Sequence, residues 1–289
     1  MTGRQRLRAA IDDAAAALAR AGIESARADA ELLAAHVAGA ERGMLTMTGL
    51  TGLSGGDFQD RFDRAVAVRV RRVPLQHITG TAAFGPIEVQ VGPGVFIPRP
   101  ETESLLEWAL AQPLPRAPVI LDVCTGSGAL AIALASRLTA ARVIAVDDDA
   151  AALEYARRNA ASSTPAGTVE VVAGDVGDPG LLAELTDSVD LVVANPPYLP
   201  DGTPLEPEVA CHDPAHALFG GPDGMAVIAA VVARATGWLK SGGLLAIEHD
   251  DTAAAATADL LARSFDAVES RRDLCGRPRF VTARRSPRR

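Results

Sequence analysis

The sequence predicts an α/β fold built on a doubly wound, mostly parallel sheet, which a small helical domain precedes in the sequence. Two observations lead to this prediction. From residue 118 onward, near-continuous apolar runs of strand length alternate with amphipathic helical runs, as expected for parallel strands that helices cover on both faces. Before residue 73, apolar residues recur at the spacing of helices instead.

Three apolar faces predict the helical domain, which we place at residues 1–73. Residues that share a face are three or four positions apart, as one side of a helix requires. The faces are Leu7, Ile11, Ala14 and Leu18, then Leu32, Leu33, His36 and Val37, and then Phe58, Phe62, Val66 and Val70.

Residues 74–100 differ in character, because glycine and proline interrupt short β-type pieces such as "IEVQV". We expect a hairpin-containing linker here, followed by a helix that begins near Glu101. The second domain is then residues 101–289.

Seven strands are expected in that domain. Five follow from "VILDVC", "RVIAVD", "VEVVAGD", "VDLVVANPP" and "GLLAIEHD", with helical runs at 129–138, 149–161, 181–186 and 224–240 between them. The last stretch, "AVESRRDLCGRPRFVTARR", predicts two antiparallel edge strands.

Composition excludes several classes of protein. The net charge of −8 argues against broad binding to duplex DNA, which requires many basic side chains. No apolar run approaches the roughly 20 residues of a membrane helix. The three cysteines form no ligand pair, so we expect no metal site and no disulfide framework. A cytoplasmic location is the simplest expectation.

A glycine turn between the first predicted strand and its helix indicates a nucleotide-type ligand. "LDVCTGSGALAIA" places Gly126 and Gly128 where the chain must turn tightly and a ligand can approach the backbone. Asp122, Asp147 and Asp175 stand at the ends of three strands, in register. Asp147 is suited to ribose hydroxyls, Asp175 to an adenine edge and Asp122 to a positive group. The turn alone does not separate NAD from S-adenosylmethionine (SAM).

The motif "NPPY" follows the fourth strand of the parallel series. Two prolines fix two φ angles and donate no backbone hydrogen bond, so they make a rigid turn. We expect this turn to present the Asn195 side-chain oxygen and the Pro196 carbonyl to one planar NH2 group, with Tyr198 as a flat stacking face. Such acceptors would orient a poorly nucleophilic amide or aromatic amine beside a methyl donor.

These motifs together resemble those of SAM-dependent amino-methyltransferases, which have a class I, Rossmann-like fold. A closer resemblance is to the protein-(glutamine-N5) methyltransferases of peptide chain release factors, and it covers nearly the whole chain. It includes "FIPRPETE", "DVCTGSGALAIALA", "AVDDDAAALEYARRNA", "VANPPYLP", "EPEVACHDPAHALFGGPDG" and "GGLLAIEH". "FIPRPETE" is the most specific part, because DNA methyltransferases do not share it.

The resemblance implies a reaction, a cofactor and a partner. The methyl group of SAM would go to the glutamine of the Gly-Gly-Gln motif in release factors 1 and 2, leaving S-adenosylhomocysteine, and the helical domain would grip the release factor. No stable binding to nucleic acid or membrane is expected. The expected cofactor-binding residues are Asp122, Cys124, Thr125, Gly126, Ser127, Gly128, Asp147, Asp148, Asp175, Val176 and Asn195. The expected catalytic and substrate-binding residues are Asn195, Pro196, Pro197 and Tyr198, joined for substrate binding by Arg99.

The chain departs from the family pattern at two positions. Cys124 replaces the first glycine of the loop, and Val176 replaces an aromatic residue found in some relatives. No function is assigned to Glu248 or His249. Four alternatives stay open: glutamine methylation of a ribosomal protein, adenine-N6 methylation of DNA, an NAD-dependent oxidoreductase and a noncatalytic nucleotide-binding scaffold. The oxidoreductase would need a proton-relay pair such as Tyr-x-x-x-Lys, which the sequence lacks.

Overall fold

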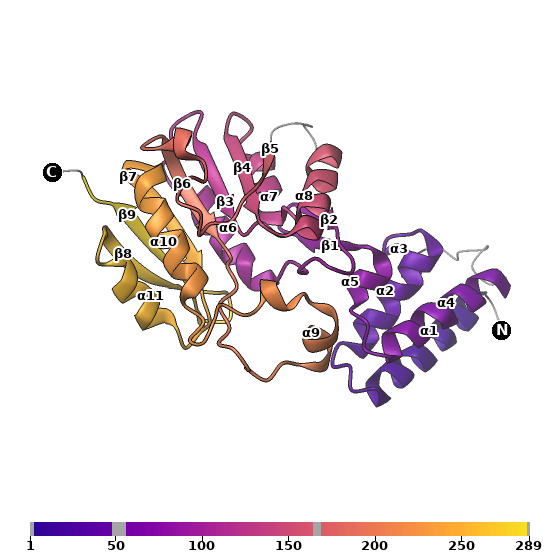
Figure 1. Cartoon of the computed structure of the whole chain (residues 1–289). Helices are drawn as coiled ribbons and strands as arrows, with labels where there is room; N and C mark the ends of the chain where they lie inside the picture. Colours follow the sequence, from indigo (N-terminus) through magenta and orange to yellow (C-terminus); the bar gives the residue numbers. More distant parts are fainter. Residues whose placement is uncertain (1–2, 48–55, 164–168, 288–289) are drawn as a thin grey trace. The chain divides into compact units, whose positions relative to one another are not determined.

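Figure 1 shows the computed structural model of the chain, which describes residues 3–47, 56–163 and 169–287. The chain divides into two compact units. One comprises Met1–Thr81 with Glu206–His212, and the other comprises Ala82–Leu205 with Asp213–Arg289. In the described ranges, no helix combines the length and the apolar character needed to cross a membrane.

The first unit is helical. Its core is built from buried apolar side chains of four of its helices, with Leu18, Leu33 and Phe62 almost completely buried. The described helices of this unit are α1 (Gly3–Arg20), α2 (Ala26–Ala38), α3 (Met44–Met47), α4 (Gly56–Val70), α5 (Leu75–Thr79) and α9 (Pro207–His212).

The predicted apolar face of α1 is confirmed, since Ile11, Ala14 and Leu18 are buried. The face predicted for the second helix is partly wrong. Leu32 and His36 are exposed, because alanines rather than large side chains fill much of the buried side of α2. Small residues on both sides of a contact let helices approach closely, and this pattern is easily missed when large apolar residues are sought.

A buried ion-pair cluster explains why the face predicted for the third helix also needs correction. Val70 is exposed, whereas its neighbour Arg69 is buried. The Arg69 guanidinium pairs with Asp29 at 2.7 Å and with Glu208 at 3.0 Å. Arg72 also contacts Glu208, at 3.1 Å. These pairs attach α9, which is distant in sequence, to the helical unit, and neither α9 nor α5 was predicted.

The second unit is the doubly wound α/β domain that the sequence predicts. Its seven strands run in the order β5-β4-β3-β6-β7-β9-β8, and β3 to β7 are parallel to one another. The strands are β3 (Val119–Val123), β4 (Arg142–Asp147), β5 (Val169–Ala173), β6 (Val189–Ala194), β7 (Leu239–Glu248), β8 (Phe265–Arg272) and β9 (Pro278–Arg285).

Three local predictions in this unit need correction. Of the two strands expected at an edge, only β8 lies there, because the β8–β9 hairpin joins the sheet through β9, which pairs antiparallel with β7. The run 181–186 forms only a 3-10 turn, Ala183–Leu185, because Leu182 has a left-handed φ of 49° that interrupts an α-helix. Asp122 is not in register with Asp147, since it pairs with Ala145, two residues earlier in β4.

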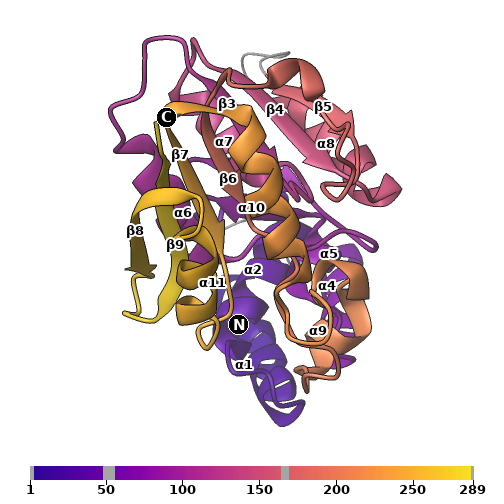
Figure 2. The same cartoon turned by 60° about the vertical axis from the view of Figure 1, so that its left-hand side comes forward.

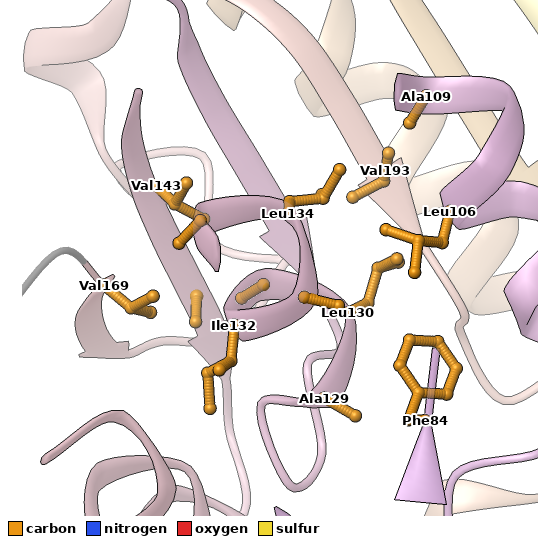
Figure 3. Close-up of a cluster of buried hydrophobic side chains, with 14 of the residues drawn as sticks. Phe84, Leu106, Ala109, Ala129, Leu130, Ile132, Leu134, Val143, Val169 and Val193 are labelled. Atoms are coloured by element: carbon orange, nitrogen blue, oxygen red, sulfur yellow. The ribbon is translucent and has the colours of Figure 1, made fainter. Parts of the chain in front are cut away.

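Helices cover both faces of the sheet (Figures 1 and 2). One face packs against α6 (Glu103–Leu110), α7 (Ala129–Arg137) and α8 (Ala150–Ser162), and the hairpin of β1 (Thr81–Phe84) and β2 (Ile87–Gln90) extends this core. Figure 3 shows Leu130 of α7 directed toward Leu106 of α6.

The opposite face packs against α10 (Ala226–Trp238) and α11 (Ala254–Leu261), with Trp238 fully buried. The chain leaves β3 toward β4 and β5 on one side and later returns to β6 and β7 on the other. The strand order therefore reverses at β3, and ligands of such sheets bind at the carboxyl ends beside this reversal.

Candidate active site

A cavity of about 580 Å³ lies at the carboxyl ends of β3, β4, β5 and β6. The loop after each of these strands contributes to its wall: residues 124–127, 147–149, 174–177, and Asn195 with Pro197. Residues from before β3 and from after the Asn-Pro-Pro-Tyr turn also line it, among them Phe84, Phe96, Pro98, Thr102, His216 and Phe219. The cavity therefore stands where the strand order predicts a ligand.

The glycine loop is held in shape by the carboxylate that precedes it. Asp122 Oδ2 accepts hydrogen bonds from Thr125 Oγ1 at 2.5 Å and from the Ala131 backbone at 3.0 Å. Burial raises the pKa of this carboxyl to about 7. Gly128 has a φ of 82°, and a Cβ at this position would lie 3.3 Å from the Ala156 backbone, so this glycine permits close packing on α8.

Cys124 adopts the same left-handed backbone region, with a φ of 60°. Side chains rarely occupy this region because the Cβ approaches the following carbonyl, so the loop carries local strain. Burial and the neighbouring carboxylates raise the pKa of the thiol well above its usual range. A protonated thiol is a weak nucleophile, which agrees with a structural role.

The cavity wall is strongly acidic. The aspartates on it are Asp122, Asp147, Asp148, Asp149 and Asp175, and no lysine or arginine of the described residues lines it. Burial raises the pKa of Asp147, while hydrogen bonds from the backbones of Gly126 and Asp149, at 2.8 and 3.0 Å, favour its charged form. A wall of this kind favours a ligand with positive charge and disfavours a pyrophosphate.

The Asn-Pro-Pro-Tyr turn begins directly after β6, and its members differ in placement. Asn195 and Pro197 line the cavity. Pro196 is buried and Tyr198 is half-buried, and neither lines the cavity. The Asn195 amide nitrogen donates to Thr102 Oγ1 at 3.2 Å. The Tyr198 hydroxyl donates to Glu248 Oε1 at 3.2 Å. This arrangement leaves the Asn195 side-chain oxygen as the group available to a ligand.

Two glycines that the sequence did not single out support the turn from behind. A Cβ at Gly220 would collide with the Pro197 carbonyl, and one at Gly224 with the Tyr198 carbonyl. The Leu199 backbone donates a hydrogen bond to the Leu218 carbonyl and accepts one from the Gly220 backbone, both at 2.9 Å, which holds the two segments side by side. The "GGPDG" stretch is therefore a backbone cradle for the turn.

Comparison with known proteins agrees with this geometry. A model of the PrmC N-terminal domain matches residues 9–80, and one of the methyltransferase small domain matches residues 93–210. The release factor glutamine methyltransferase of Mycolicibacterium smegmatis is 59% identical over 287 residues, which cover 97% of this chain and 98% of that protein. The protein of the same name from Mycobacterium tuberculosis strain H37Rv is 59% identical over 285 residues, covering 96% and 91%.

The chain belongs to the release factor glutamine methyltransferase family. The family resemblance and the fold class predicted from the sequence are thereby confirmed, and the protein is a methyltransferase. Among solved structures, the ribosomal protein L11 methylase of Lactobacillus delbrueckii subsp. bulgaricus matches with a TM-score of 0.47 and 19% identity, over 71% of this chain and 92% of that one.

The two residues at which this family member departs from the pattern both line the cavity. Cys124 lies in the glycine loop, and Val176 is buried in the loop after β5. Arg99 does not line the cavity. It pairs with Asp213, and its guanidinium lies 4.8 Å from the centre of the Phe96 ring. Arg99 therefore ties the "FIPRPETE" segment to the loop after α9, and a direct role in substrate binding stays a prediction.

Sequence reasoning missed Thr102 and Glu248. Thr102 lies within "FIPRPETE", whose specificity was a signal, but nothing in the sequence pairs it with Asn195. Glu248 ends β7, and its neighbour Ile247 pairs with Ala194 at the end of β6. Burial raises the pKa of the Glu248 carboxyl to about 7, although Thr102, Arg279 and Tyr198 favour its charged form.

Proposed function

We propose that this protein transfers a methyl group from SAM to the side-chain amide nitrogen of the glutamine in the Gly-Gly-Gln motif of release factors 1 and 2, in the cytoplasm. The observation that supports this most directly is Asn195 at the cavity wall, with its amide nitrogen engaged by Thr102 and its oxygen left for a substrate. Membership of the family adds the identity of the substrate.

The residues of the cavity fit SAM. SAM is positively charged at its sulfur and at its amino group, and five aspartates match that charge in a lining that holds no lysine or arginine of the described residues. Each oxygen of Asp147 accepts one backbone hydrogen bond and retains a lone pair for a ribose hydroxyl. Gly126 offers open space to a ligand, since a Cβ there would contact nothing.

When bound, SAM supplies a methyl group on a positively charged sulfur, which is a good leaving group. The protein's own task is to present the nitrogen of a substrate amide, which is a poor nucleophile because its lone pair is delocalised. We assign this task to the Asn195 side-chain oxygen and the Pro196 carbonyl, each accepting one hydrogen of the substrate NH2 group. Two fixed acceptors orient the lone pair and favour the charge that develops on nitrogen.

The proton of the attacking nitrogen needs no strong base before transfer. Its acidity rises sharply once the nitrogen has bonded to carbon, so it is lost to solvent afterwards. Orientation is then the main contribution of the site, and effective molarities of well-placed groups, on the order of 10⁵ M or more, show that orientation can accelerate a reaction greatly.

The test is to incubate the purified chain with methyl-labelled SAM and a release factor, and to locate the label by mass spectrometry. Parallel reactions contain a release factor whose Gly-Gly-Gln glutamine is replaced by alanine, ribosomal proteins, or duplex DNA. Label on that glutamine, and none on the alanine variant, is the expected result. Label on a ribosomal protein or on adenine, with the release factor unlabelled, would overturn the proposal.

A further inference from the structure

A buried chain of polar side chains runs behind the Asn-Pro-Pro-Tyr turn. The Asn195 amide nitrogen donates to Thr102 Oγ1, and the Thr102 side chain in turn lies beside the Glu248 carboxyl, whose charged form it favours. Glu248 Oε1 accepts from the Tyr198 hydroxyl. Thr102 is 4% exposed and Glu248 is 1% exposed, so these side chains are largely shielded from solvent.

One carboxyl oxygen in this series of polar side chains lacks a complete hydrogen bond. Glu248 Oε2 is buried, and no group of the described residues meets it with full hydrogen-bond geometry. An unsatisfied buried acceptor costs free energy, typically about 1 to 3 kcal/mol. The Thr102 hydroxyl interacts with this carboxyl and has a single proton to donate.

That single proton determines which group donates and which accepts in each hydrogen bond of this polar series. When Glu248 is ionised, its carboxyl only accepts hydrogen bonds, so a Thr102 hydroxyl directed at it cannot also donate to Asn195. Its oxygen must instead accept from Asn195, as the 3.2 Å contact shows. The NH2 end of the Asn195 amide then faces Thr102, and the oxygen end faces the cavity.

We infer that Glu248 is a positioning residue, which fixes through Thr102 which end of the Asn195 amide faces the substrate. The inference rests on the proposed function. Without the Glu248 acceptor, the Thr102 hydroxyl is free to donate to the Asn195 oxygen, and the amide can rotate by half a turn. An NH2 group would then meet the NH2 group of the substrate, and two donors repel each other.

Glu248 acts on the other end of the turn as well. Its bond to the Tyr198 hydroxyl holds the aromatic ring that follows the two prolines. One carboxyl therefore anchors the first and the last residue of the four-residue turn. The charge of Arg279 lies close enough to favour the ionised form, while Glu101 opposes it.

Replacement of Glu248 by glutamine tests the inference, because glutamine keeps the shape and brings its own NH2 donor. We expect Glu248→Gln to lower kcat by about 10- to 100-fold, as loss of a partner behind a reacting group commonly does. KM for the release factor and Kd for SAM should change by less than about threefold. Glu269→Gln, the same substitution at an exposed site on β8, should leave kcat unchanged.

A pair of variants at Thr102 tests the link itself. Thr102→Val keeps the volume and removes the hydroxyl, so it should lower kcat as much as Glu248→Gln. Thr102→Ser keeps the hydroxyl and should retain most of the activity. Equal losses in Thr102→Val and Thr102→Ser, or a Glu248→Gln variant with kcat within about twofold of the parent chain, would overturn the inference.

A measurement without turnover separates this inference from the proposed function. The side-chain NH2 signal of Asn195 can be assigned by NMR from its disappearance in Asn195→Ala. We expect slow hydrogen exchange of this group in the parent chain and faster exchange, by about tenfold or more, in Glu248→Gln and Thr102→Val. If the parent chain methylates no release factor, the proposed function is wrong. If exchange is equal in all variants, the positioning role is wrong.

Discussion

Two buried carboxylates, one in each unit, are held in opposite ways. Both oxygens of Asp29 in α2 are paired: Oδ2 accepts from Arg69 Nε at 2.7 Å and Oδ1 from Ser25 Oγ at 2.8 Å. Glu248 at the end of β7 has a hydrogen-bonded Oε1 and an Oε2 with no full partner in the described part of the chain. Asp29 is therefore an acid whose pairing stabilises the fold, whereas burial of Glu248 costs free energy.

The same contrast extends to the surroundings. Around Asp29, every charge meets an opposite charge, with Arg69 also contacting Glu208. Around the cavity, five aspartates gather with no lysine or arginine among the described lining residues, and Cys124 has strained backbone. Unbalanced charge and strain commonly concentrate where a ligand is expected to restore the balance. The following substitutions test this contrast.

Loss of the paired acid should have the largest effect on stability. Asp29→Ala leaves the Arg69 guanidinium buried beside Glu208 alone, and we expect it to reduce the free energy of unfolding of the helical unit by about 3 kcal/mol. Both tryptophans, Trp108 and Trp238, belong to the other unit. Far-UV circular dichroism should therefore show an earlier loss of helix during denaturation, while the tryptophan fluorescence transition stays in place.

The matched control for Asp29→Ala is Asp12→Ala, which removes an exposed ion pair with Arg27. Exposed pairs contribute little, so we expect a change below about 1 kcal/mol. Similar losses in the two variants would show that burial of the Asp29 pair is unimportant.

Asn195→Ala should instead affect turnover and spare the fold. It removes the acceptor that holds the substrate nitrogen, and we expect kcat to fall by about 10²- to 10³-fold, as for other preorganised groups at reacting atoms. SAM should still bind detectably by calorimetry, and the denaturation midpoint should change little. A variant that transfers methyl groups at more than about a third of the parent rate would contradict the role given to Asn195.

Glu248→Gln should change how stability depends on pH. Burial raises the pKa of this carboxyl in the folded chain to about 7, from 4.5. The folded state therefore retains a proton that the unfolded state loses, and stability falls as pH rises between these two values, by up to about 3 kcal/mol. The glutamine variant carries no such proton, so its advantage over the parent should grow from pH 4.5 to pH 7 and then level off.

Denaturant midpoints at a series of pH values measure that difference. The buried Asp122 carboxyl, whose pKa is also raised to about 7, is present in both proteins and cancels in the comparison. Parallel pH profiles for the two proteins would mean that Glu248 is not titrating in this range, and that the unpaired oxygen imposes no charge-dependent cost.

The sequence was sufficient for the features that depend on local pattern. Alternation of apolar runs predicted the parallel strands, and the glycine turn and the prolines located two of the loops that line the cavity. Contacts between segments that are distant in the sequence could not be predicted from local pattern. Thr102 and Asn195 are 93 positions apart, and Glu248 lies a further 53 positions beyond Asn195, so no local pattern joins them.

Two other failures have physical causes of the same kind. The exposed Leu32 was expected in the core because alanine packing leaves no strong apolar signal. Gly220 and Gly224 were not singled out, because their role is to leave room for the carbonyls of a segment more than 20 positions earlier. In both cases the missing information was the identity of the segment that packs against these residues, and that is known only from the folded structure.

The smallest expected effect concerns strain beside the cofactor loop. Cys124 has a φ of 60°, where glycine is favoured, so Cys124→Gly should relieve the strain and raise the free energy of unfolding by up to about 1 kcal/mol, partly offset by the greater freedom of glycine in the unfolded chain. Cys124→Ala retains the Cβ and should give no such gain. Thermal denaturation of the two variants side by side measures the difference. Equal midpoints would show that the left-handed backbone at Cys124 costs no stability. Backbone strain would then no longer distinguish the cavity from the surroundings of Asp29.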